Sequence, residues 1–287
     1  MTALPPALST PAQAPAPRSV FDPYARTAPA SRARFLYALN PLAKLAGPAP
    51  AMLLLVFVRD LATPLAFLAL AYALVLVGVR FTGRIALLLF VAIPVAVAAI
   101  GIGFSLWVDA GQVDHTPVLV QVGGWTLFEG ALEIGFATSL RLAAITSLAL
   151  LAGLSTTGPD LVRSMVQQLR VPYRIGYTAL AAFRFVPRFG HELEVIRQAH
   201  RVRGAHGGRG PFAALARWGG YMVPLLAGAI RHAERVALAM DARAFGAYPD
   251  RTERHLVPFR ARDVVFVLAF WIVSAGLFVA FFPWTLT

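Results

Sequence analysis

The 287-residue sequence has no cysteine and few charged residues, and each shortage restricts the class of protein. Without cysteine the chain can form no disulfide bond and no thiolate zinc site. Charged residues make up 14% of the chain and hydrophobic residues 58%, which is far more apolar than an ordinary soluble domain. Mean hydropathy is accordingly positive, at +0.66. The composition therefore predicts a membrane protein.

The sequence also lacks the short motifs of common enzyme classes. It contains no G-x-x-x-x-G-K-[ST] phosphate loop, no H-E-x-x-H zinc motif and no G-x-S-x-G nucleophile turn. His200 and His206 flank a glycine-rich stretch, but the six histidines show no compact ligand spacing, so metal binding is the weaker interpretation. Gly101 and Gly103 resemble a dinucleotide fingerprint, yet they lie in an apolar run where close helix packing explains them better. We expect no catalytic residue, no metal site and no directly bound cofactor.

Long apolar runs are what the sequence has in abundance. A helix needs about 18 or more apolar residues to cross about 30 Å of hydrocarbon. Five runs meet or approach that length, at about 42–58, 64–79, 85–108, 130–154 and 264–283. Pro48 and Pro50 predict that the first of them is a broken or tilted helix.

Basic residues are concentrated between the fourth and fifth runs. Residues 159–262 hold 17 of the 26 Lys and Arg but 7 of the 14 Asp and Glu. The net charge of +12 could indicate nucleic-acid binding, but retention of positive residues on the cytoplasmic side accounts for it without such a partner. Residues 109–133 contain four acids and no Lys or Arg, so we expect this loop outside and the N-terminus inside.

Together these patterns predict an all-α membrane protein with about five transmembrane helices and three amphipathic helices inserted before the last span. The expected parts are a disordered cytoplasmic tail at 1–34, four transmembrane helices in 35–155, a cytosolic domain at 156–262 and a final transmembrane helix in 263–287.

Local signals place the first inserted helix. Thr157 can cap its start with Asp160 three residues on, and Pro159 lies in the first turn, where its missing N–H costs nothing. Pro172 ends the run. We therefore expect a short helix from Thr157 to just before Pro172.

Two longer helices should follow, at about 173–200 and 212–244. Arg184 lies on a charged face of the first, and Pro187 should kink it. Gly246 is placed to cap the end of the second. Both helices are too charged to span a membrane.

Three arginines stand out. Arg203 and Arg243 each lie among small residues at a predicted helix end. Arg141 lies near the middle of the fourth apolar run, where a charge costs about 3 kcal/mol unless it faces protein or water. We expect Arg141 to face inward, where it either bonds within the bundle, for example to Glu133, or contacts a partner subunit.

From Arg141 onward the sequence resembles the transmembrane T component (EcfT/CbiQ-like) of energy-coupling factor transporters. The resemblance is specific over roughly 130–246 and only topological before that. The elements that carry it are Arg141, Thr156–Asp160, Leu169–Pro172, Arg184–Pro187, Ala199–Gly204 and the later Ala-Arg-Ala-Phe-Gly.

The resemblance implies a multi-pass subunit of a bacterial or archaeal cell-membrane importer. Its partners would be two ATP-binding-cassette ATPases, which bind the ATP, and a membrane subunit that captures a vitamin or transition metal. The family's two Ala-Arg-Gly motifs, which dock the ATPases, correspond to Val202-Arg203-Gly204 and Ala242-Arg243-Ala244. The residues implied to support the coupling helices are Thr157, Pro159, Asp160, Pro172, Arg184 and Pro187.

The alternative is a stand-alone multi-span protein, either a secondary carrier or an intramembrane enzyme. A carrier would need ionisable groups at mid-membrane and paired repeats, and only Arg141 qualifies. An enzyme would need clustered acids, and those of 109–133 are the candidates. The sequence does not identify the cargo.

Overall fold

The computed structural model of the chain describes residues 34–113, 116–122, 125–204, 211–249, 252–253 and 255–283. The expected tail lies outside these ranges except for its last residue, and so does His206. In chain order the elements are η1 (Phe35–Ala38), α1 (Pro41–Ala46), α2 (Pro48–Leu55), α3 (Ala62–Gly78), α4 (Gly83–Leu87), η2 (Leu88–Ala92), α5 (Ile93–Ser105), α6 (Ala110–Val113), β1 (Val118–Val122), β2 (Trp125–Phe128), α7 (Glu129–Ser155), α8 (Gly158–Gln168), α9 (Tyr173–Val202), α10 (Pro211–Asp241) and α11 (Ala261–Ala280).

The predicted helical membrane fold is confirmed. Among the described residues, three helical stretches are long and apolar enough to cross a membrane, and two shorter apolar stretches precede them; the five are Pro41–Leu55, Ala62–Gly78, Gly83–Ser105, Glu129–Ser155 and Ala261–Ala280. The first is broken as expected, because α1 ends at Ala46 and α2 begins at Pro48. The prediction did not include the antiparallel hairpin of β1 and β2, which lies within the acidic loop.

Contacts divide the chain into two compact units. The membrane unit combines Arg26–Phe183 with Arg243–Thr287. The helix-pair unit contains Arg184–Ala242 and, outside the described residues, Met1–Ala25. The predicted boundaries between membrane and cytosolic parts stay a prediction, since these units are defined by contacts alone.

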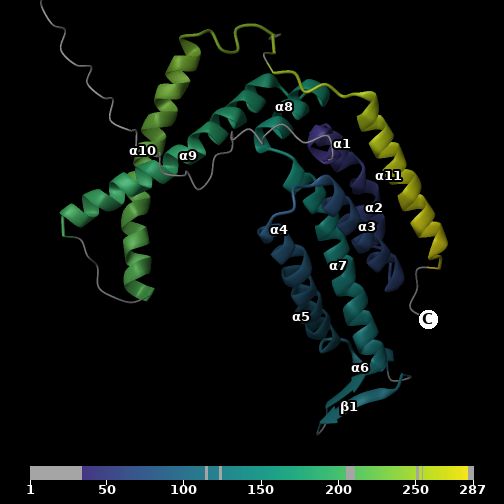
Figure 1. Ribbon diagram of the computed structural model, residues 1–287. Helices are drawn as coiled ribbons and strands as arrows, with labels where there is room; N and C mark the ends of the chain where they lie inside the picture. The colour runs from purple at the N-terminus through teal and green to yellow at the C-terminus, as the bar shows by residue number, and fades with distance from the viewer. Residues whose placement is uncertain are drawn as a thin grey trace, which may run out of the picture. The chain divides into compact units, whose positions relative to one another are not determined.

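Helix α7 is central to the membrane unit and packs against α3 and α5 (Figure 1). Its approach to α5 is close: a Cβ on Gly135 would lie 2.4 Å from the carbonyl oxygen of Gly101, and one on Gly101 would lie 3.0 Å from Ser139 Oγ. A Cβ on Gly103 would have no atom within 4 Å. Close packing therefore explains Gly101, as predicted, but not Gly103.

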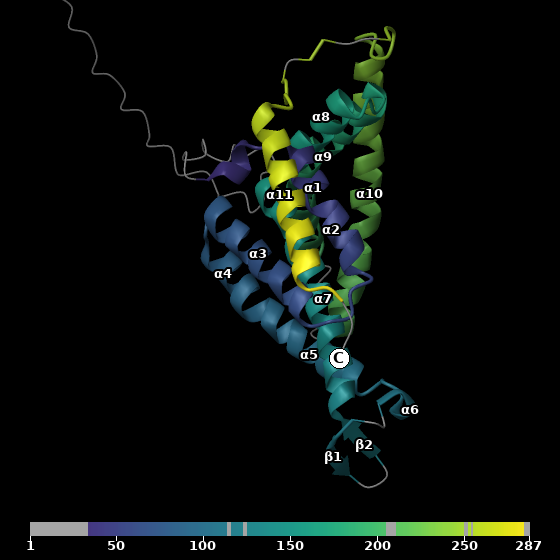
Figure 2. The ribbon, with the colours of Figure 1, turned by 90° about the vertical axis from the view of Figure 1, so that its right-hand side faces the viewer.

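The last helix, α11, packs against α1, α2 and α3 (Figure 2). Phe67 of α3 and Phe278 of α11 meet with ring centroids 4.9 Å apart. Both rings belong to one buried apolar cluster, in which the largest fully buried side chains are Leu36, Leu55, Phe67, Leu89, Leu148 and Leu151. The chain segments before and after the inserted helices thus share one apolar core.

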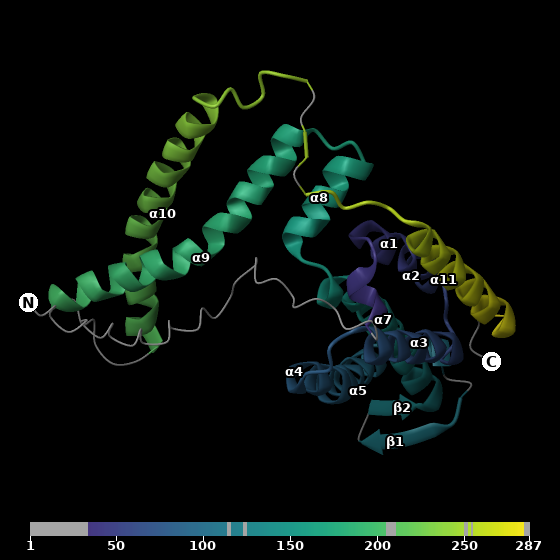
Figure 3. The ribbon, with the colours of Figure 1, turned by 45° about the horizontal axis from the view of Figure 1, so that its top comes forward.

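The three inserted helices, α8, α9 and α10, begin and end close to their predicted positions. Helix α9 continues through Pro187 to Val202, and the kink expected at Pro187 stays a prediction. In the helix-pair unit α10 crosses the C-terminal half of α9 (Figure 3), and Phe185 stacks on His232 with ring centroids 4.3 Å apart. His200 meets Tyr221 edge-on with centroids 5.2 Å apart. Aromatic contacts therefore join the two long helices.

Candidate functional site

The first arginine turn, Val202–Gly204, ends α9. The Arg203 N–H donates to the carbonyl of Ala199 at 3.2 Å, and the Gly204 N–H to that of Arg201 at 3.0 Å. Gly204 has φ +68 and nothing within 4 Å of its Cβ position. Val202, Arg203 and Gly204 are all exposed. Within the described ranges, no side chain forms a hydrogen bond or ion pair with Arg203.

The second arginine turn, Ala242–Gly246, follows α10. The Ala242 N–H donates to the carbonyl of Leu238 at 2.9 Å, and the chain then turns at Ala244, with φ +56, and at Gly246, with φ +88. The prediction that Gly246 caps α10 is therefore wrong in position. The helix ends at Asp241, the first left-handed residue is Ala244, and Gly246 forms the next bend.

The two turns share one backbone feature. In each, the residue directly after the arginine is left-handed, Gly204 in the first and Ala244 in the second. This conformation ends a helix by turning the chain away from the helix axis. Both arginines therefore lie at helix ends, as the sequence predicted. Their exposure and the common backbone shape of the two turns are findings of the structure.

Among the described residues, of the two arginine turns only the second and the residues directly after it form hydrogen bonds or ring contacts with side chains of another helix. The side chains that make them belong to the first turns of α9. Tyr173 Oη donates to the carbonyl of Tyr248 and Arg174 Nη2 to that of Gly246, each at 2.6 Å. The rings of Tyr173 and Phe245 meet edge-on at 5.8 Å. The start of α9 thus anchors the turn that follows α10.

The same anchoring continues along the linker to α11. Gln167 of α8 bonds this segment twice at 2.8 Å, donating to the His255 carbonyl and accepting from the Val257 N–H. Gln168 Nε2 donates to the Val257 carbonyl at 2.8 Å, and Tyr177 donates to Glu253. The second arginine turn is therefore continuous with a strip of chain held on α8 and α9.

A buried polar junction ties this strip to the membrane helices. Asp263, fully buried at the start of α11, accepts the backbone N–H groups of Asn40 and Arg260, both at 2.7 Å. Asn40 Nδ2 donates to the same Val257 carbonyl at 3.2 Å. Buried Lys44 donates to the Ser155 carbonyl, at the end of α7, at 2.8 Å. The sequence analysis assigned no role to these three residues, although a lysine inside one apolar run and an aspartate directly before another were the available signal.

The residues expected to support the inserted helices take several positions. Thr157 caps α8 as predicted, since its Oγ1 accepts the Asp160 N–H at 3.3 Å and donates to Asp160 Oδ2 at 2.7 Å. Pro159 lies in the first turn of α8. The Pro172 carbonyl accepts the Ile175 N–H at 3.0 Å, which places it at the start of α9. Arg184 and Pro187 are exposed residues inside α9. Their functional roles stay predictions.

Arg141 bonds within the membrane unit. Its Nη1 donates to the carbonyl of Val56, directly after α2, at 3.2 Å, and its Nε is buried with no hydrogen-bond partner among the described residues. The suggested partner Glu133 is not within ion-pair distance. The Arg141 guanidinium therefore satisfies a carbonyl at the end of a helix.

The described residues contain no cluster of His, Asp or Glu that could hold a metal ion.

Comparison with known proteins assigns a family to this arrangement. A family model described as cobalt transport protein (CbiQ) matches residues 32–254. The energy-coupling factor transporter transmembrane protein EcfT of Bacillus subtilis is 26% identical over 170 residues, which cover 56% of this chain and 64% of the relative. The protein of the same name from Limosilactobacillus fermentum is 30% identical over 204 residues, 66% of this chain and 76% of the relative.

A third similarity is of another kind. A putative ABC transporter ATP-binding protein of Bifidobacterium longum is 29% identical over 171 residues, which cover 56% of this chain but 22% of that protein. The chain spans slightly less than two thirds of the first relatives it matches, 64% and 63%. The family model nevertheless covers most of the sequence, and the chain belongs to the CbiQ/EcfT family of transmembrane components of energy-coupling factor transporters.

Proposed function

We propose that this chain is the scaffold and coupling subunit of an energy-coupling factor importer for a vitamin or transition metal. The observation that carries the proposal is the pair of exposed arginine turns, each with a left-handed residue directly after the arginine. In this proposal the turns dock two cytosolic ATPases, which bind the ATP, and the chain itself catalyses no reaction.

The chemistry of arginine suits such docking. A guanidinium presents five donors in a planar fork, which can bind a carboxylate or backbone carbonyls with two bonds at once. The small residues beside Arg203 and Arg243 would let the helix end enter a groove on a partner. The similarity to a segment of an ABC transporter ATP-binding protein supports ATPases as those partners.

The helices behind the turns supply a route for motion. ATP-driven movement of the ATPases would displace the ends of α9 and α10, and the exposed apolar side chains of α10 would pass it to a substrate-capture membrane subunit. These side chains include Leu215, Val223 and Leu238, each more than half exposed. The basic composition of residues 159–262 supports a cytoplasmic location for this part.

The test is recovery of the ATPases. The full chain carries an affinity tag, is co-expressed with candidate ATPases and is solubilised in mild detergent. We expect wild type to recover the ATPases and the Arg203→Ala, Arg243→Ala double variant to lose them.

A matched control removes the same charge elsewhere. Arg201 and Arg262 are exposed and belong to neither turn, so the Arg201→Ala, Arg262→Ala double variant should recover ATPases normally. Equal recovery by both double variants would contradict docking through the turns. Transport or turnover by the purified chain alone would instead favour the stand-alone carrier or enzyme.

A further inference from the structure

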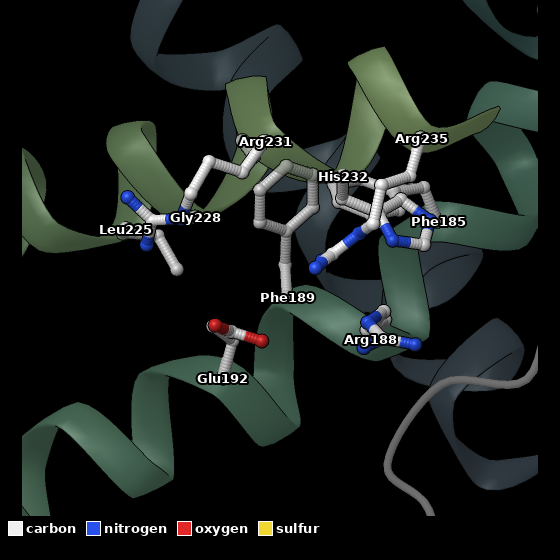
Figure 4. A pocket seen from close by; sticks show the side chains of 10 residues that line it. Phe185, Arg188, Phe189, Glu192, Leu225, Gly228, Arg231, His232 and Arg235 are labelled. Carbon is white, nitrogen blue, oxygen red and sulfur yellow. The ribbon is translucent and has the colours of Figure 1, made fainter. Parts of the chain in front are cut away.

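In the helix-pair unit, α9 and α10 enclose a hollow of about 240 Å³. Figure 4 shows the side chains around it. Phe189 of α9 and Leu225 and Ala229 of α10 contribute apolar side chains to its lining. Phe185 stacks on His232 at its edge, with ring planes 23° apart.

The charged side chains that line the hollow are mostly basic. Three arginines border the hollow, Arg188 from α9 and Arg231 and Arg235 from α10, against one acid, Glu192. In Figure 4 Glu192 reaches into the space from α9 and Arg235 reaches in from α10. Among the described residues, none of these guanidinium groups lies within 4.0 Å of the Glu192 carboxylate. Among the described residues that line the hollow, basic groups therefore outnumber acidic ones by three to one.

We propose that this hollow binds the phosphate of an anionic lipid headgroup. A guanidinium binds two oxygens of a phosphate at once, and several arginines beside apolar side chains suit a phosphate ester that carries an apolar group. The exposed side chains of Met222, Leu226 and Ile230 continue an apolar surface along α10, on which an acyl chain could lie. A lipid satisfies both parts of the surface, whereas free phosphate satisfies only the charge. This inference does not depend on the docking of ATPases.

The probes are phosphatidylglycerol and phosphatidylcholine, offered in equal amounts to the purified full chain in nanodiscs. Native mass spectrometry then counts the lipids that stay bound. We expect wild type to retain phosphatidylglycerol preferentially, and the Arg231→Gln, Arg235→Gln variant to retain it about tenfold less, the effect of losing a charged hydrogen bond. Glu192→Gln should increase retention, because it removes the one repelling charge.

Controls separate this site from general charge attraction. The Arg201→Gln, Arg262→Gln variant changes net charge equally and should behave as wild type, and circular dichroism checks that each variant keeps its helices. Equal losses in both double variants, or no lipid preference in wild type, would overturn the proposal. Binding of inorganic phosphate in phosphatidylcholine nanodiscs, with the same dependence on Arg231 and Arg235, would assign the hollow to free phosphate and overturn the lipid assignment.

Discussion

The two arginine turns have the same local backbone but different support. At the first, the last described contact of α9 is that of His200 with Tyr221, and Arg203 and Gly204 extend beyond it. At the second, Tyr173 and Arg174 bond the backbone just after Arg243. A turn that is already held loses less conformational freedom when it binds a partner. The second turn is therefore pre-organised, and in the proposed docking the first turn would lose more conformational freedom.

The largest effect should come from reversing the arginine charges. Arg203→Glu and Arg243→Glu should each abolish recovery of ATPases, since loss of a docked charged group costs about 2–5 kcal/mol. If the second turn is pre-organised, Arg243→Glu should be the more severe change. Measured ATPase affinities should rank wild type, Arg203→Glu and Arg243→Glu in that order, with Arg201→Glu near wild type. If Arg203→Glu weakened ATPase binding more than Arg243→Glu, the contacts from α9 would not make the second turn the better pre-organised of the two.

The second largest effect should come from Asp263 in the buried polar junction, which holds the chain that follows the second arginine turn. In Asp263→Asn, an amide replaces a carboxylate that accepts two backbone N–H groups, so the side chain keeps one good acceptor. An unsatisfied buried donor costs about 1–3 kcal/mol. We expect a lower thermal midpoint for the purified chain. Asp109→Asn, at an exposed position, is the control, and an unchanged midpoint in Asp263→Asn would show that the junction does not support the fold.

A smaller effect isolates the anchor itself. Arg174→Ala removes the bond to the Gly246 carbonyl and should weaken ATPase binding about fivefold, since a partly exposed charged hydrogen bond contributes about 1 kcal/mol. Arg174→Lys should restore part of the loss, because lysine can still donate to that carbonyl.

A double-mutant cycle distinguishes positioning from general destabilisation. If Arg174 acts through the second turn, Arg174→Ala should have no further effect in an Arg243→Ala background, and its full effect in an Arg203→Ala background. Equal effects in both backgrounds would mean that Arg174 does not position Arg243.

Sequence patterns predicted the features that depend on neighbouring residues. Apolar runs located the five apolar helical stretches, and Thr157 with Asp160 located the start of α8. The missed hairpin also had a local signal, because Gly123 and Gly124 separate two β-branched and aromatic runs.

The contacts that distinguish the two turns could not be predicted in this way. Arg174 and Gly246 are 72 positions apart, and Lys44 and Ser155 are 111 apart. No spacing rule connects such pairs, because their meeting depends on how the helices pack. The partner of Arg141 shows the same limit: Glu133, two turns away on one helix, was the local suggestion, and the distant Val56 carbonyl is the actual acceptor.

The smallest effect should come from exchanging the left-handed residues. Ala244 holds φ +56, which costs an L-residue about 1 kcal/mol, whereas Gly204 holds φ +68 without that penalty. Ala244→Gly should therefore raise the thermal midpoint slightly, by less than the full penalty because glycine also loses more freedom on folding. Gly204→Ala should strain the first turn, although nothing within 4 Å would obstruct its Cβ. If the bonds from α9 hold the second turn in shape, Ala244→Gly should leave ATPase affinity nearly unchanged, while Gly204→Ala, in the unsupported turn, should lower it. A loss of affinity in Ala244→Gly as large as that in Gly204→Ala would show that the second turn depends on its own backbone preference, as the first does, and that the anchor does not set its shape.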